Sequence, residues 1–366
     1  SGVHFNYSFP DNFWKFNKFK SKNLSDKQLK EIVYFRAMRN IHRMNWIILY
    51  FFGASPIFDK SFLKQDQKEF KRYKNSLYLP HATSIRMSEL GYQNINQSNL
   101  RVSINSLKNY VDDLYRLTST HNPDFNFSDS LKKLNNIQLN SNQLQIEDEY
   151  YSISRPKSDN TSNIRIATKL KKFGVNYIEF RSLDVDPFSS IGIQKATLDF
   201  LEAFIMFCAF SPSPFIGSNE IKEIRQNDLL VAREGRKPGL ELMQNNKRVS
   251  LKDWANQILE DMEPFFETLY IKQSDKTHWK EMASNPEETF SAKFIQTIFD
   301  SNLDLNEFGI YIAGKNSREF CRIDNKENSI WDLLDNECTD SKKRQESLES
   351  VNPESFKEYI DKYFKS

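Results

Sequence analysis

Hydrophobic and polar residues alternate in three separate segments of the chain, a pattern typical of β-strands with one buried face. In residues 1–9, apolar side chains occupy one face, and small or polar side chains, including His4 and Asn6, occupy the other. Residues 83–92 repeat the pattern and place Arg86 on the polar face. Successive side chains of a strand point to opposite faces of its sheet. Both segments therefore predict strands that turn polar side chains toward one open face.

The third segment, residues 177–188, places a carboxylate and a guanidinium side by side on one face of a predicted strand. Ile178 and Phe180 point to the core, so Glu179 and Arg181 point together to the opposite side. One interpretation is an exposed ion pair that contributes less than ~1 kcal/mol to stability. The two preceding segments favour the other interpretation, in which the three strands form one sheet whose open face is a functional site.

Helical periodicity predicts long helices outside these strands. Ser25 and Gln28 have the spacing of a capping box, so a core helix is expected to begin there and to end near Gly53. His42 within this helix is interpreted as a hydrogen-bonded histidine, because one histidine alone makes no metal site. Further helices are predicted for residues 103–120, residues 193–210, the segment after Ser250 and most of the chain beyond it.

Three other segments carry weaker signals. Residues 137–154 alternate twice around a polar turn at residues 140–142, which predicts a β-hairpin. Residues 155–157 are expected to stand at the beginning of a loop. Residues 335–354 are rich in charge and predict a solvated helix face or a loose connector.

Helices and strands segregate along the chain instead of alternating, so the predicted fold class is α+β. The Ser-Pro-Ser-Pro run at residues 211–214 is expected to break a helix. It marks the predicted boundary between residues 1–210, which hold the predicted sheet and its supporting helices, and a mostly helical part, residues 211–366, packed on the same domain.

Composition and charge narrow the classes of function. The chain has 366 residues and a net charge of +2, so it can bury a sizeable core, and we expect no nucleic-acid or membrane partner. Its three cysteines lack CxxC spacing, which predicts no disulfide framework, no zinc site and a cytoplasmic location. The longest apolar run, residues 46–54, is shorter than the ~20 residues that span a bilayer. The chain begins within a predicted strand and without a methionine, so we expect that an N-terminal portion precedes it.

No P-loop, GxGxxG or HExxH motif occurs in the chain. The polar residues of the predicted sheet nevertheless suit one kind of chemistry. Carboxylate and imidazole groups bind divalent cations, and nearby arginines grip carboxylates or phosphates through two parallel hydrogen bonds. Enzymes that transfer the terminal phosphoryl group of ATP commonly use magnesium ions held by carboxylates, with arginines nearby.

Six sequence blocks, in order along the chain, resemble one known family. The blocks are residues 2–6, 52–56, 84–92, 155–157, 177–184 and 234–239. Together they closely resemble the bacterial glutamate–cysteine ligases (γ-glutamylcysteine synthetases) of the proteobacterial type. The resemblance runs from Ser1 to at least Gly239 and more loosely to about residue 300.

The resemblance implies an α+β fold related to glutamine synthetase, in which an antiparallel sheet forms a funnel-shaped active site and helices pack outside it. It implies the first step of glutathione biosynthesis, in which ATP phosphorylates the γ-carboxylate of L-glutamate and the amine of L-cysteine then displaces phosphate. Metal ions and arginine would stabilise the developing negative charge. The implied cofactor is Mg²⁺ or Mn²⁺, the implied partners are the small-molecule substrates, and we expect a monomer.

The same resemblance assigns roles to residues of the predicted sheet. His4 and Glu179 match metal ligands, and Arg181 matches the arginine that stabilises the transferred phosphoryl group. Asn6 shares the face of His4, and it either contacts nucleotide or substrate or is a plain surface residue.

Arg86, Tyr92 and Tyr151 match residues that hold the acceptor cysteine, chiefly its carboxylate. A guanidinium suits a carboxylate, whereas the residues alone would favour packed or rim aromatics for the two tyrosines. Arg155 and Lys157 either contact the phosphates of ATP or are surface charges of a loop.

Four charged residues close to these blocks have weaker assignments. Asp184 and Asp186 are expected to cap the turn at Pro187 and not to bind metal. Arg236 and Lys237 are candidate contacts on the nucleotide side of the site.

The chain also departs from the family pattern, since complete members are considerably longer at the N-terminus. The missing part supplies further metal-binding glutamates, so the chain by itself is expected to have weak ligase activity or none. Two alternatives remain open at this point. The chain is a non-catalytic remnant that binds amino acids or a partner, or it is a related carboxylate–amine ligase with another amine acceptor.

Overall fold

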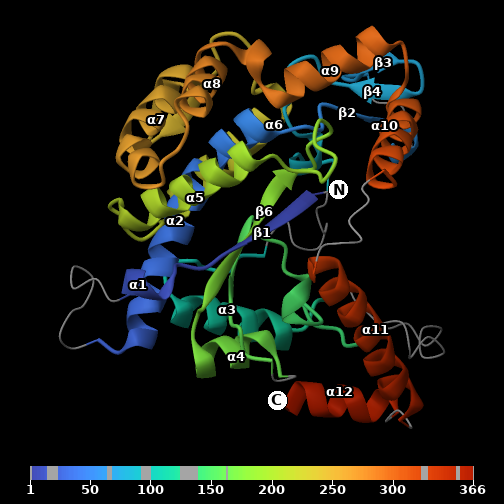
Figure 1. Ribbon diagram of the computed structural model, residues 1–366. Coiled ribbons are helices and arrows are strands. Elements are labelled where there is room, and N and C mark those ends of the chain that lie inside the picture. Colours follow the sequence, from blue (N-terminus) through green and yellow to red (C-terminus); the bar gives the residue numbers. More distant parts are fainter. Residues whose placement is uncertain are drawn as a thin grey trace. The chain divides into compact units, whose positions relative to one another are not determined.

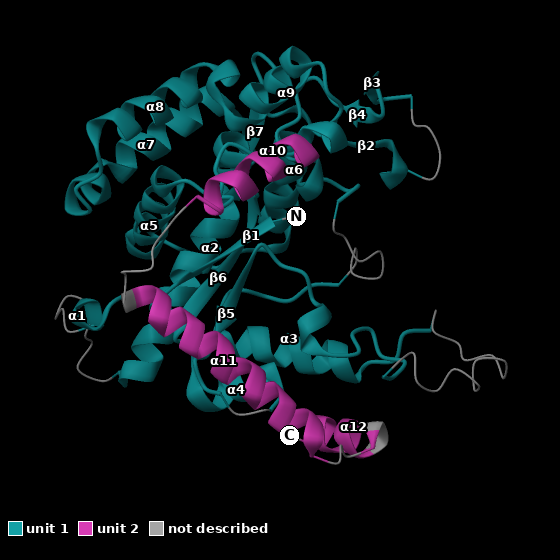
Figure 2. Ribbon diagram, turned by 45° about the vertical axis from the view of Figure 1, so that its right-hand side comes forward, with its two compact units in different colours: residues 1–308 teal, residues 309–366 magenta. Residues whose placement is uncertain are grey.

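The computed structural model describes residues 2–14, 24–63, 68–91, 100–123, 139–161, 164–322, 329–351 and 355–365. The chain divides into two compact units, residues 1–308 and residues 309–366 (Figure 2). The predicted boundary between residues 210 and 211 lies inside the first unit and stays a prediction. All the candidate site residues lie in the first unit.

The central sheet of the first unit has the order β1-β6-β5, and all its strand pairs are antiparallel (Figure 1). Its strands are β1 (Gly2–Tyr7), β6 (Tyr177–Asp184) and β5 (Ser154–Lys157). The first and third alternating segments therefore form strands, as predicted. The register places Asn6 of β1 and Arg155 of β5 opposite Glu179 of β6, and it slips between Val3 and Phe5, beside His4.

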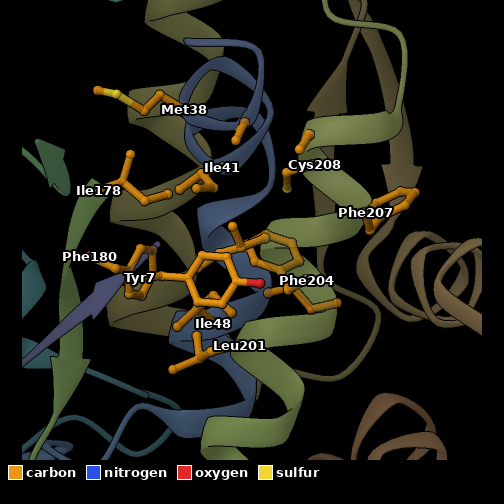
Figure 3. Packing of buried hydrophobic residues seen from close by; sticks show 14 of the residues in the cluster. Tyr7, Met38, Ile41, Ile48, Ile178, Phe180, Leu201, Phe204, Phe207 and Cys208 are labelled. Atoms are coloured by element: carbon orange, nitrogen blue, oxygen red, sulfur yellow. The ribbon is translucent and has the colours of Figure 1, made fainter. Parts of the chain in front are cut away.

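One face of this sheet packs on helix α2 (Asp26–Phe52), and Tyr7 of β1 also reaches helix α5 (Lys195–Phe210), where its hydroxyl lies 3.4 Å from Glu202 Oε1. Figure 3 shows Tyr7, Ile178 and Phe180 turned toward side chains of both helices. The predicted capping box is present, with Ser25 and Gln28 bonded reciprocally, and α2 ends at Gly53 as predicted. The opposite face of β6 therefore carries Glu179 and Arg181.

Residues 83–92 do not form the predicted strand. Among their described members, Ile85–Met87 form a 3₁₀ turn, η2. The N–H groups of Thr83 and Ser84 donate to Ala232 O, so these donors cannot pair with a neighbouring strand. The alternation in this segment reflects a buried turn in which Ser84 and Ser88 are also buried.

The predicted hairpin in residues 137–154 is also wrong for the part that the structure describes, from residue 139 onward. Its backbone pairs with the end of a preceding helix, because Gln143 N donates to Thr120 O and Leu144 N donates to Leu117 O. Residues 155–157 lie in strand β5, where the sequence predicted a loop. Pro156 is tolerated there because β5 ends the described sheet.

The remaining elements are mainly helical, and two small sheets, β2-β4-β3 and β7-β8, were not predicted. The strands are β2 (Ile57–Asp59), β3 (Lys71–Tyr73), β4 (Ser76–Tyr78), β7 (Glu241–Gln244) and β8 (Lys247–Ser250). The first helices are α1 (Asp11–Trp14), α3 (Leu107–Ser119), α4 (Ile166–Phe173), α6 (Ser218–Glu234) and α7 (Leu251–Thr268). The others are α8 (Gln273–Ser284), α9 (Phe290–Ser301), α10 (Leu305–Phe320), α11 (Ser329–Ser350) and α12 (Phe356–Lys365).

The helices predicted from periodicity are confirmed, although the one expected from residue 103 begins at Leu107, after the N-cap Ser106. The charge-rich segment forms most of the exposed helix α11. None of the helices in the described parts of the chain is long and apolar enough to cross a membrane.

Candidate active site

Glu179 is the centre of a charged cluster on the face of the sheet that points away from α2. His4 Nδ1 lies 3.1 Å from Glu179 Oε1, Lys157 Nζ lies 3.4 Å from Oε2, and Arg181 Nη1 lies 3.9 Å from Oε2. The side chains of Glu179 and Arg181 are only 12% and 14% exposed. The interpretation of these two residues as an exposed surface ion pair is therefore wrong.

Two buried polar atoms of this cluster lack hydrogen-bond partners within the described part of the chain. They are Glu179 Oε2, whose neighbour Lys157 lies within ion-pair range but outside hydrogen-bond geometry, and Arg181 Nε. An unpaired buried polar atom costs about 1–3 kcal/mol, so native proteins keep few of them. Their presence side by side on β6 is typical of a site that a polar ligand completes.

Arg155 stands on β5 directly opposite Glu179 and is buried, not a surface charge of a loop. Its Nη2 donates to the carbonyl oxygens of Asp148 (2.9 Å) and Tyr150. Burial, reinforced by the nearby charge of Arg181, lowers the pKa of Arg155. This guanidinium is therefore largely committed to the loop that precedes β5.

Arg86 lies on η2, outside the central sheet, and forms a short ion pair with β6. Its Nε lies 2.6 Å from Asp184 Oδ1. Asp184 therefore does not cap the turn at Pro187 as predicted. Asp186 does cap it, since its Oδ1 accepts a hydrogen bond from Phe188 N at 2.8 Å.

Tyr151 contacts Arg181 and also Met87, the residue that follows Arg86 in the chain. The Arg181 guanidinium sits 5.3 Å from the centroid of its ring, within the range of a cation–π contact. Its hydroxyl lies 3.6 Å from Met87 Sδ, next to Arg86. Asn6 is exposed beside this cluster. Tyr92 lies outside the described residues.

A cavity of about 540 Å³ adjoins this region and is lined in part by Arg86 and Tyr151. His42 of α2 also lines it, and the His42 Nε2 lies 3.0 Å from Ser154 Oγ. Burial lowers the pKa of His42 to about 3, so the ring is neutral, in agreement with its interpretation as a hydrogen-bonded histidine. Asp228 of α6 contributes a carboxyl group to the cavity wall, which the sequence gave no reason to select.

Arg236 and Lys237 do not contact the Glu179 cluster. Arg236 is buried and donates from Nε to Ala82 O and from Nη2 to Pro80 O. Lys237 is exposed and pairs with Glu234 at 2.7 Å. Nothing in this geometry supports their interpretation as nucleotide contacts.

The described residues alone do not make a complete metal centre. No group of three or more His, Cys, Asp or Glu residues suited to a metal occurs among them. His4 and Glu179 offer two adjacent donors, whereas Mg²⁺ requires octahedral coordination and usually keeps water or substrate phosphates in its shell. These two residues fit part of such a shell and no more.

The sheet and its charges define a class of protein, one that binds anionic ligands on the open face of an antiparallel sheet. One carboxylate, one imidazole and two cationic side chains, Lys157 and Arg181, converge on the open face of an antiparallel sheet, and apolar helices cover the other face. Such a surface is equipped to bind anionic groups such as carboxylates and phosphates.

Comparison with known proteins identifies the family. The model of the glutamate–cysteine ligase family matches residues 1–231, and this chain belongs to that family. A glutamate–cysteine ligase of Pseudomonas paraeruginosa is 36% identical over 328 residues, which cover 87% of this chain and 62% of the relative. One from Alcanivorax borkumensis is 34% identical over 382 residues, covering 100% of this chain and 72% of the relative.

Comparison with solved structures supports the same family assignment. The crystal structure of a glutamate–cysteine ligase from Francisella tularensis in complex with AMP matches with a TM-score of 0.87 and 30% identity, over 100% of this chain and 72% of that one. This match confirms the predicted α+β fold class. A bifunctional glutathione synthetase from Pasteurella multocida, at a TM-score of 0.65 and 19% identity, shares the fold. The chain spans between half and two thirds of the length of the first Pseudomonas relatives that it matches.

Proposed function

We propose that this chain carries out, or forms the catalytic part of a protein that carries out, ATP-dependent joining of L-glutamate to L-cysteine. The observation that carries the proposal is the pair of buried, hydrogen-bond-deficient atoms on Glu179 and Arg181, within the segment that the family model matches. The names of the relatives and the AMP complex of the Francisella ligase support the choice of substrates and nucleotide. The product would enter glutathione biosynthesis as its first intermediate.

The proposed reaction has two steps. A γ-carboxylate oxygen of glutamate attacks the terminal phosphorus of ATP, and the bond from that phosphorus to ADP breaks. The amine of cysteine then attacks the acyl carbon, the carbon–oxygen bond to phosphate breaks, and the amine loses a proton. Phosphorylation is needed because a carboxylate is a poor electrophile and hydroxide a poor leaving group. Both steps build negative charge on oxygen atoms, which fixed cations stabilise.

Arg181 would stabilise the transferred phosphoryl group. Its guanidinium is held by Tyr151 on one side and by Glu179 on the other. His4 and Glu179 would hold Mg²⁺, or Mn²⁺, together with phosphate oxygens and water. A bound divalent ion would supply additional positive charge at the phosphates.

The remaining site residues would orient the substrates. Arg86 would bind the carboxylate of the substrate cysteine, and Tyr92 and Tyr151 would help to hold the same substrate. Lys157 points to Glu179 Oε2 and would reach the phosphates of ATP, with Arg155 behind it. Asn6, exposed and opposite Glu179, would contact nucleotide or substrate.

The location and assembly of the protein are part of the same proposal. We place it in the cytoplasm as a monomer. Its three cysteines are free, one buried and two exposed, which fits a reducing compartment.

The test is phosphate release from ATP with Mg²⁺ and glutamate, measured with and without cysteine. Glu179→Gln and Arg181→Ala are each expected to lower the cysteine-dependent rate by about 10²-fold or more. Glu241→Gln and Arg248→Ala change an exposed pair, at 49% and 77% exposure, and should leave the rate unchanged.

The matching substitutions in the Alcanivorax borkumensis relative give a second readout in a protein named as this ligase. Rates near that of the parent for Glu179→Gln and Arg181→Ala would contradict the assigned roles. Release that requires glutamate and another amine, but not cysteine, would replace the proposed acceptor.

A further inference from the structure

The Arg86 guanidinium is held along one edge by a carboxylate that is itself fixed. Asp184 Oδ1 accepts from Arg86 Nε at 2.6 Å, and the Asp184 side chain is only 2% exposed. Asp184 Oδ2 accepts from Ala54 N and from Ser55 Oγ, each at 2.8 Å. The carboxylate cannot rotate without losing hydrogen bonds from two other segments of the chain, so it sets the direction of the Arg86 side chain.

The other edge of the guanidinium has a different environment. Arg86 Nη2 is shielded from solvent and, within the residues that the structure describes, has no hydrogen-bond partner. A guanidinium whose Nε is occupied still offers its two terminal nitrogens to a carboxylate, end-on, in a bidentate pair. The hydrogen bond to Asp184 thus selects which edge of Arg86 is offered to a ligand.

Gly2 lies against the same guanidinium from the neighbouring strand, opposite Asp184 in the register of β1 and β6. A Cβ at this position would lie 2.8 Å from Arg86 Nη1, 2.9 Å from Arg86 Cζ and 3.0 Å from Leu183 O. Any side chain there would therefore displace the guanidinium, because the end of a long side chain moves more easily than a strand. The absence of a side chain at Gly2 makes room for this orientation of Arg86.

We propose that Asp184 and Gly2 are positioning residues that hold Arg86 end-on, with both terminal nitrogens directed to the α-carboxylate of the acceptor amino acid. The orientation follows from the contacts above, and the identity of the carboxylate rests on the proposed function. The acceptor site is thereby specific for an α-amino acid, since an amine without the carboxylate leaves the terminal edge of Arg86 unpaired.

The main test compares Gly2→Ala with a matched control, Gly217→Ala, where an added Cβ meets no atom within 4 Å. Ligase rates are measured with L-cysteine and with 2-aminoethanethiol, which has the same amine and thiol but lacks the carboxylate. Gly2→Ala is expected to raise KM for cysteine by about tenfold or more, because it costs a charge-assisted hydrogen bond. In Gly2→Ala, KM for 2-aminoethanethiol and kcat should not change. Gly217→Ala should leave kcat and both KM values unchanged.

Arg86→Lys and Asp184→Asn should give the same pattern, a loss confined to the acceptor that carries a carboxylate. An equal loss for both acceptors in Gly2→Ala would overturn the inference, since that result indicates general damage to the site. A rise in KM for glutamate alone would overturn the assignment of Arg86 to the acceptor.

A second measurement does not depend on turnover. The hydrogen-exchange rate of the Arg86 Nε–H is followed by nitrogen-15 NMR, with the signal assigned by Arg86→Lys. This proton should exchange more slowly than that of Arg248, which is 77% exposed, and Gly2→Ala should accelerate it. Exchange as fast as that of Arg248 in the parent protein would refute the positioning role, whether or not the chain is a ligase.

Discussion

Asp228 is a carboxyl group in a position that does not favour its charge. Its Oδ2 accepts from Asn45 Nδ2 at 3.0 Å, and its Oδ1 is buried without a partner among the described residues. Burial raises the pKa of Asp228 to about 8, so the group carries a proton at neutral pH. Asn45 Oδ1 in turn accepts from Ser182 Oγ of β6 at 2.6 Å, which links this acid to the strand that bears Glu179.

The protonation of Asp228 predicts a pH dependence of stability. Between about pH 4 and pH 8 the folded protein retains a proton that the unfolded chain has lost, so this contribution to the free energy of unfolding falls as pH rises. Asp228→Asn mimics the neutral acid, so it should remove this fall with pH. Its free energy of unfolding should exceed that of the parent by about 1–3 kcal/mol at pH 8.5 and by little at pH 4. Urea denaturation at both pH values measures it.

Asp112→Asn is the control for this experiment, because the Asp112 side chain is 55% exposed and should leave the pH dependence as it is. If the free energies of unfolding of Asp228→Asn and the parent differed by the same amount at both pH values, Asp228 would not be a buried, protonated acid.

The end of α6 holds the segment that leads to Arg86. Arg236 donates to the carbonyls of Pro80 and Ala82, and its backbone N donates to His81 O at 3.0 Å. Thr83 adds a hydrogen bond from Oγ1 to Val231 O at 2.9 Å. A guanidinium suits this place because its planar fork can serve two backbone carbonyls at once.

Arg236→Met should therefore destabilise the protein, by about 2–4 kcal/mol, since it leaves buried carbonyl oxygens unpaired. Lys237→Met is the control, because the neighbouring Lys237 side chain is 54% exposed and its pair with Glu234 contributes little. The free energy of unfolding from urea denaturation measures both. Equal stabilities for the two variants would mean that Arg236 does not anchor this segment.

At the scale of the whole molecule, the core belongs to one unit. Every residue that is buried in the described parts of the chain lies at or before Phe308, although helices continue to residue 365. Among the side chains of the second unit, residues 309–366, whose exposure the structure describes, none is fully buried. Because burial of apolar surface is the main source of stability, the first unit should fold without the second.

Removal of residues 309–366 is expected to shift Tm by less than about 2 °C and to leave a single unfolding transition. The comparison variant ends at residue 289, which also removes the buried residues Phe290, Phe294 and Ile298 and should lower Tm much further. Differential scanning calorimetry of both truncated chains measures this. A large loss on removal of residues 309–366 alone would show that the second unit stabilises the first.

The sequence by itself determined the features that depend on local pattern. Alternation predicted β1 and β6 and placed Glu179 and Arg181 on one face, because side chains of a strand must alternate. The capping box and the apolar periodicity predicted α2, because helix ends and helix faces follow from residues a few positions apart. Six short blocks in order were sufficient to predict the family.

Only the tertiary structure decided the features that depend on distant residues. Thr83 and Ser84 alternate like a strand, but α6 takes their N–H groups, so Arg86 lies on a turn. Residues 155–157 read as a loop, but β6 supplies the partners that make them a strand. The proton of Asp228, the fixed direction of Arg86 and the anchoring role of Arg236 all arise from burial and from partners more than 80 positions away. Local periodicity contains no information about such partners, because a side chain's charge state and direction are set by what packs against it.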